Sequence, residues 1–148
     1  MKRIFIDADK CEGCKNCSVA CMLGHDSDDN GNVYSLDLKL PQNESRNTIL
    51  RSFAKQNIPL FCRHCDKPGC AEACMSGAMV KDAAGYVRYD KDKCAKCFMC
   101  VMSCSFGVLK VDRATGTYVV KCDFCKEHGD EPSCAKMCPK KAIHVEEV

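Results

Sequence analysis

One cysteine pattern constrains this chain more than any other feature of its sequence. Residues 94–104 place four cysteines at the spacing Cys-x-x-Cys-x-x-Cys-x-x-x-Cys, and residues 11–21 repeat that spacing. Two variants of the pattern occupy residues 62–74 and 122–138, and together the four quartets use all sixteen cysteines of the 148-residue chain. The sixteen are Cys11, Cys14, Cys17, Cys21, Cys62, Cys65, Cys70, Cys74, Cys94, Cys97, Cys100, Cys104, Cys122, Cys125, Cys134 and Cys138. Any fold for this chain has to organise four groups of four thiols.

A cysteine content this high is typical of a disulfide scaffold, of zinc sites or of iron–sulfur clusters. A disulfide scaffold needs an oxidising compartment and usually a secretory signal, but residues 1–11 (MKRIFIDADKC) contain no apolar segment of that kind. No apolar run approaches the roughly 20 residues of a membrane span. We therefore predict a cytoplasmic protein with no membrane anchor, in which the cysteines are metal ligands.

The spacing favours clusters over zinc. Zinc sites pair two separated Cys-x-x-Cys turns around one ion, whereas here a third cysteine follows after two residues and a fourth after three more. In bacterial ferredoxins with this spacing, the first three cysteines hold one 4Fe–4S cluster and the fourth ligates the neighbouring cluster. A zinc-binding interaction module is the alternative from another class. A c-type haem is excluded, because His64 lies inside its Cys-x-x-Cys rather than after it.

The remaining residues do not suggest catalysis. We find no nucleophile–base pairing, phosphate-binding glycine loop or dinucleotide fingerprint. The net charge is +2, and the lysines are interleaved with acids, which argues against binding of nucleic acid. The sixteen thiols leave no ligand position for a histidine to fill, so we assign the four histidines surface or structural roles. They are His25, His64, His128 and His144. The chain is predicted to carry electrons and not to be an enzyme.

Local patterns predict an α+β fold of short elements. Residues 2–7 alternate between the two faces of a strand, with Ile4 and Ile6 on one face, which predicts a strand there. Residues 142–145 supply a last strand that could pair with it. The spacing of four from Cys17 to Cys21 would place both thiols on one side of a helical turn.

Residues 24–57 form the longest segment without cysteine. It opens with an Asp/Asn/Gly-rich loop at residues 25–32. Residues 33–40 then partly alternate as a strand would, and residues 46–53 are a further candidate strand. The segment is either an ordinary surface insertion or a docking element, and we favour docking.

An internal repeat organises the middle of the chain. Residues 74–82 (CMSGAMVKD) match residues 104–112 (CSFGVLKVD). Each copy is followed by a glycine-containing turn and an alternating run, which predicts a β-hairpin in each repeat.

With these motifs assembled, the sequence resembles the four-cluster ferredoxin-like electron-transfer subunits of the dimethyl sulfoxide reductase and formate dehydrogenase type. Within that group it is most similar to the iron–sulfur subunit associated with carbon monoxide dehydrogenase. The resemblance rests on the order of the quartets, on NIPLFCRHCDKPGCAEAC, on GYVRYDKDKCAKCFMC and on KCDFC followed by CAKMCPKKAI. It covers nearly the whole chain apart from about residues 24–45.

The resemblance implies four 4Fe–4S clusters held by crossed ligation, in two interleaved dicluster modules. In the outer module, cluster 1 would take Cys11, Cys14, Cys17 and Cys138, and cluster 2 would take Cys122, Cys125, Cys134 and Cys21. In the inner module, cluster 3 would take Cys62, Cys65, Cys70 and Cys104, and cluster 4 would take Cys94, Cys97, Cys100 and Cys74. The outer module would span residues 1–23 and 117–148, and the inner module residues 58–116, with residues 24–57 as the insertion.

The resemblance also implies partners. The subunit would belong to a hetero-oligomer and relay single electrons from a catalytic subunit, best assigned as carbon monoxide dehydrogenase. The acceptor would be a flavin-dependent NAD(P) oxidoreductase or a hydrogenase. Alternatives are a tungsten aldehyde oxidoreductase, a formate dehydrogenase or a hydrogenase as the catalytic partner.

Overall fold

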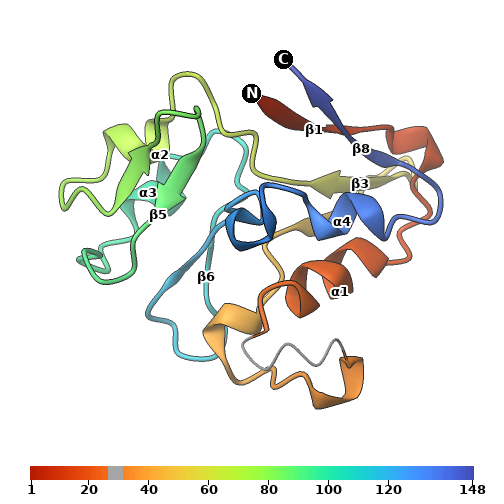
Figure 1. Ribbon diagram of the computed structural model, residues 1–148, viewed down its shortest axis with the longest axis horizontal. Coiled ribbons are helices and arrows are strands. Elements are labelled where there is room, and N and C mark those ends of the chain that lie inside the picture. Colours follow the sequence, from red (N-terminus) through yellow and green to blue (C-terminus); the bar gives the residue numbers. More distant parts are fainter. Residues whose placement is uncertain (27–31) are drawn as a thin grey trace.

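The computed structural model describes residues 1–26 and 32–148, and it consists of short helices and two-stranded antiparallel sheets (Figure 1). Most of the loop predicted at residues 25–32 lies outside the described residues. The strands are β1 (Lys2–Ile6), β2 (Thr48–Arg51), β3 (Asn57–Leu60), β4 (Met79–Lys81), β5 (Val87–Tyr89), β6 (Lys110–Val111), β7 (Val119–Val120) and β8 (Ile143–Glu147). The α-helices are α1 (Asn16–Leu23), α2 (Gly69–Glu72), α3 (Met99–Met102) and α4 (Ser133–Lys136). Short 3-10 helices lie at Ala8–Lys10, Val33–Ser35, Pro41–Asn43 and Lys126–His128. The predicted α+β class is confirmed at this level.

The two ends of the described chain pair with each other. Strands β1 and β8 run antiparallel, with Ile4 opposite Val145 and Ile6 opposite Ile143. Figure 1 shows the resulting ribbon beside α4, which comes just before β8 in the chain. The predicted pairing of residues 2–7 with the last strand is therefore confirmed. This pairing of β1 with β8 brings the fourth cysteine quartet close to the first.

The sequence repeat is also a structural repeat. Strands β4 and β5 form one hairpin, and β6 and β7 form the other. The matching glycines Gly77 and Gly107 both adopt the left-handed conformation, with φ of 68° and 59°. The matching aspartates accept hydrogen bonds from backbone N–H groups of their own turns: Asp82 from Tyr86 at 2.8 Å, and Asp112 from Thr115 at 2.6 Å. Equivalent residues thus shape equivalent turns.

The segment of residues 24–57 differs in part from its prediction. Residues 33–40 form a 3-10 helix and turns rather than a strand, because Val33, Tyr34 and Leu38 face solvent and meet no partner strand. The strand predicted within residues 46–53 exists as β2. Its partner β3, which sequence reasoning did not identify, contains Pro59, a residue that strands accept where no ladder N–H is needed.

Part of this segment supports the first quartet. The side chain of Asn47 is buried and donates to the carbonyl oxygen of Cys17 at 3.1 Å, while it accepts from the Ser18 hydroxyl at 2.6 Å. The structure gives this half of the segment a supporting role, and the docking prediction stays a prediction for its exposed residues.

The buried apolar residues form two clusters, and cysteines are a large part of both. One cluster of nine buried residues includes four cysteines, and a second of four residues includes two. Figure 1 shows α2, α3 and β5 on one side of the molecule and α1, α4, β1 and β8 on the other. Among the described residues, no helix has the length and apolar character that crossing a membrane would require.

Candidate metal centres

All four cysteine loops share one backbone feature. The residue just before the second cysteine of each loop is left-handed: φ is 72° at Gly13, 45° at His64, 58° at Lys96 and 61° at Phe124. Three of the four are not glycine, so each costs about 1–2 kcal/mol of backbone strain that the surrounding structure must offset. A left-handed residue in such a turn can direct successive N–H groups to one side of the loop, an arrangement that binds anions.

The first cavity collects thiols from both ends of the chain. Cys11, Cys14 and Cys17 line it together with Cys138, which reaches it from the turn between α4 and β8. Burial raises the pKa of the Cys17 thiol, and the nearby Cys11, Cys138 and Cys14 thiols raise it further. The fourth cysteine of the last quartet therefore lies with the first three of the first quartet.

A second cavity, of about 360 Å³, shows the same crossing. It is lined by Cys62, Cys65 and Cys70 of one quartet and by Cys104 of another. The packing of α2 against α3 brings these two stretches of chain together. Both cavities thus contain three thiols from one cysteine loop and one thiol from elsewhere.

Several of the remaining thiols approach one another in two other places. Burial raises the pKa of the Cys100 thiol, and Cys74 and Cys94 contribute to the rise. Burial likewise raises the pKa of the Cys134 thiol, helped by its neighbours Cys21, Cys125 and Cys17. The contact between α1 and α4 accounts for the second of these places, because it puts Cys21 beside Cys134.

Comparison with known proteins decides the family. Residues 53–148, more than half of the chain, match the model of the family described as "4Fe-4S dicluster domain". The chain belongs to the 4Fe-4S dicluster domain family.

The chain has relatives that are named as electron-transfer or iron–sulfur subunits. It is 32% identical over 141 residues to the thiosulfate reductase electron transfer subunit PhsB of Salmonella typhi, a match that covers 93% of this chain and 71% of the relative. It is 35% identical over 154 residues to the iron–sulfur subunit of the nitrate-inducible formate dehydrogenase of Escherichia coli, covering 95% and 52%. These names confirm the prediction of an iron–sulfur electron-transfer protein rather than a catalytic subunit.

A solved structure resembles this chain along nearly the whole length of the chain. The match is to the active site complex BamBC of benzoyl coenzyme A reductase, with a TM-score of 0.54 and 26% identity, and it covers 99% of this chain and 79% of the other.

The donor groups fit iron–sulfur clusters. All sixteen cysteines of the dicluster protein have free thiols. Thiolates are the usual protein ligands of 4Fe–4S clusters. Backbone N–H groups already point at two of the sulfurs: that of Arg46 lies 3.3 Å from Cys21 Sγ, and that of Lys96 lies 3.4 Å from Cys94 Sγ. Hydrogen bonds to the sulfurs are among the features that set a cluster's reduction potential.

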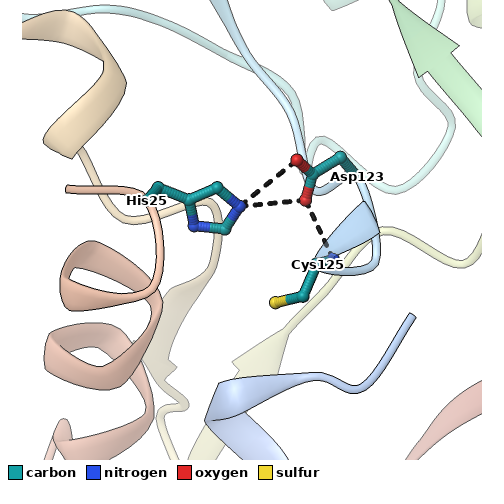
Figure 2. A group of neighbouring side chains, drawn as sticks. All are labelled: His25, Asp123 and Cys125. Carbon is teal, nitrogen blue, oxygen red and sulfur yellow. Dashed lines mark hydrogen bonds and ion pairs between the residues drawn. The ribbon is translucent and has the colours of Figure 1, made fainter. Parts of the chain in front are cut away.

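His25 joins α1 to the loop of the fourth quartet, and Figure 2 shows it beside Asp123 and Cys125. Its Nε2 lies 3.0 Å from Asp123 Oδ1, and its Nδ1 lies 2.7 Å from the carbonyl oxygen of Cys21. Both partners are acceptors, so both ring nitrogens donate and the ring is cationic. Although burial opposes the charge, hydrogen bonding to Asp123 raises the pKa of His25 to about 9. His25 therefore has a structural role, as predicted, in an ion pair that the sequence did not reveal.

His64 connects the two cysteine loops in the middle of the molecule. It is buried, and its Nδ1 accepts the N–H of Val87 at 3.0 Å. Burial lowers the pKa of His64 to about 3, so the ring is neutral. Its edge meets Phe124 at a centroid distance of 5.9 Å, and Tyr86 stacks on Phe124 at 4.8 Å. Because His64 and Phe124 occupy equivalent positions in the Cys62 and Cys122 loops, this contact holds the two loops together.

Proposed function

We propose that the protein carries four 4Fe–4S clusters with crossed ligation and passes single electrons through them between a catalytic partner and an acceptor. The observation that carries the proposal is the make-up of the two cavities, each with three thiols from one quartet and one from another. The proposed ligand sets follow the same rule throughout. They are Cys11, Cys14, Cys17 and Cys138 for cluster 1; Cys122, Cys125, Cys134 and Cys21 for cluster 2; Cys62, Cys65, Cys70 and Cys104 for cluster 3; and Cys94, Cys97, Cys100 and Cys74 for cluster 4.

Burial of the ligands supports an order for the relay. Cys14 of cluster 1 and Cys97 of cluster 4 are the two exposed cysteines, whereas all four ligands of cluster 2 are buried. The Cys122 thiol of cluster 2 is also close enough to Cys62 of cluster 3 for the latter to raise its pKa, after the larger effect of burial. We infer the order 1-2-3-4, with electrons entering and leaving on the Cys14 and Cys97 sides. The two interleaved modules would then meet between clusters 2 and 3.

For the partner, we propose carbon monoxide dehydrogenase as donor, with a flavin-dependent NAD(P) oxidoreductase or a hydrogenase as acceptor, in a cytoplasmic hetero-oligomer. The sequence resemblance supports this choice. Sixteen free thiols also suit a reducing compartment. The relatives named above favour a second candidate, a partner of the formate dehydrogenase or thiosulfate reductase type. Reduction of the purified subunit by carbon monoxide dehydrogenase with CO, compared with formate dehydrogenase with formate, separates the two.

Metal analysis tests the cluster count. Protein purified without oxygen is expected to contain about sixteen irons and about sixteen acid-labile sulfides per chain, as four cubes require. About four zincs per chain with little iron would instead establish the zinc-binding module. About eight irons would limit the protein to one dicluster unit and contradict the four-cluster relay.

A further inference from the structure

Lys121 is a buried lysine at the junction of the two middle ligand sets. Lys121 comes directly after β7 and directly before Cys122, and it is only 5% exposed. Lysine is almost never buried to this degree unless its charge is paired. A negative counter-charge is therefore expected close to the Lys121 ammonium group.

Among the described residues, this ammonium group has hydrogen-bond partners but no carboxylate at ion-pair distance. Nζ donates to the carbonyl oxygens of Val87 at 2.6 Å and Cys122 at 2.7 Å. Within the described part of the chain, none of the ion pairs involves Lys121. Two carbonyl dipoles solvate an ammonium ion, but they do not neutralise its charge.

Lys110 shows what a compensated version of this arrangement looks like. Its ammonium also donates to two carbonyl oxygens, those of Ser45 at 2.7 Å and Asn47 at 3.2 Å. A carboxylate oxygen of Glu44 lies 3.7 Å away and balances the charge. Lys121 has the same two-carbonyl geometry, and no acid of residues 1–26 or 32–148 forms an ion pair with it.

Thiols of two different ligand sets lie in the buried cluster next to Lys121. Val87, its hydrogen-bond partner, packs in the same buried cluster as Cys62, Cys70 and Cys122. Lys121 also directly precedes Cys122 and donates to its carbonyl oxygen. The ammonium thus lies against a buried cluster that contains ligands of cluster 3, Cys62 and Cys70, and a ligand of cluster 2, Cys122.

We propose that the Lys121 ammonium is the counter-charge of the two middle clusters, and that it makes both of them easier to reduce. The proposal rests on the four-cluster function proposed above. Uptake of one electron by either cluster adds one negative charge there and makes or breaks no bond, so a fixed positive charge nearby favours it. Lys121 would hold no cluster itself. Its charge would raise the reduction potentials of the two clusters through which electrons cross between the two halves of the molecule.

A merely structural role for Lys121 predicts different results, because its hydrogen bonds also tie β5 to the Cys122 loop. Two neutral variants separate the roles: K121Q keeps an N–H donor and loses the charge, whereas K121M loses both. The matched control is K126M, which removes an exposed lysine that directly follows Cys125, another ligand of cluster 2. Electron paramagnetic resonance during an anaerobic redox titration of the iron-loaded protein gives the cluster potentials.

In both neutral variants, two of the four one-electron transitions are expected to move to lower potential. A tenfold loss of electron affinity corresponds to about 59 mV for a one-electron couple. We expect at least that shift in K121Q, retained at high salt because a buried charge is screened little. In K126M we expect a smaller shift that salt abolishes.

Unchanged potentials in K121Q, or an equal shift in K126M, would overturn the role proposed for Lys121. If neither neutral variant assembles its clusters, K121R decides: full iron content with wild-type potentials supports the charge, and failure to load assigns Lys121 to packing. Wild-type protein without iron would instead refute the proposed function itself, so the two failures are distinguishable.

Discussion

Replacement of Cys138 by serine is expected to expose the thiols of Cys11, Cys14 and Cys17, which lie far away in the sequence, and to spare those of its own quartet. The reason is the first cavity, where Cys138 meets the first three cysteines of the chain. Loss of one cluster lowers the iron content from about sixteen to about twelve per chain. Anaerobic alkylation of the native variant, followed by peptide mass spectrometry, identifies the cysteines that have become reactive.

C134S is the matched control for this experiment, because Cys134 lies in the same stretch of chain but does not line the first cavity. Its neighbouring thiols are Cys21, Cys125 and Cys17. In C134S, the newly labelled residues are expected to be Cys21, Cys122 and Cys125. A C138A variant removes the serine hydroxyl, which is able to replace the thiolate as a ligand. Labelling of Cys122 and Cys125 in C138S would show that each quartet holds its own metal centre and that crossed ligation is wrong.

Removal of iron is expected to unfold most of the chain. Four of the nine residues in the larger buried cluster and two of the four in the smaller one are cysteines. Without metal, the thiols of each group would surround empty space, and too little other apolar surface is buried to hold such short helices and hairpins. Folding and metal binding are then one coupled process, as in other small metal-dependent domains.

Circular dichroism of chelator-treated protein under argon tests this expectation, with amide hydrogen exchange of the β1–β8 ribbon as a second measure. Ellipticity and protection should both fall, and they should return when iron and sulfide are restored. A chelated sample that keeps native ellipticity and slow exchange would show that the polypeptide packs without its clusters.

The sequence predicted the parts of the fold that depend on local patterns. Cysteine spacing predicted the loops, the repeat predicted hairpins β4–β5 and β6–β7, and alternation predicted the pairing of β1 with β8. The alternation at residues 33–40 was misleading because alternation has meaning only where another strand is available, and Val33 and Leu38 face solvent.

The features around the ligands were harder to predict, because they depend on contacts between distant residues. The ion pair of His25 with Asp123 joins residues 98 positions apart. The position of His25, four residues after Cys21 and just past the end of α1, was a usable signal of its closeness to a metal centre. The burial of Lys121 had a weaker signal, its place between a strand and a cysteine. The left-handed turns at His64, Lys96 and Phe124 had none, because residues of these types seldom adopt them.

The pairing of β1 with β8 has a consequence for biosynthesis. During translation β1 emerges before every other described element and β8 after all of them, so the ribbon can form only after β8 has left the ribosome. Cys11, Cys14 and Cys17 cannot meet Cys138 before that point, whereas Cys62 and Cys104 can meet earlier. With the proposed ligation, cluster assembly would proceed from the middle of these 148 residues outward, and the first quartet would complete its ligand set last.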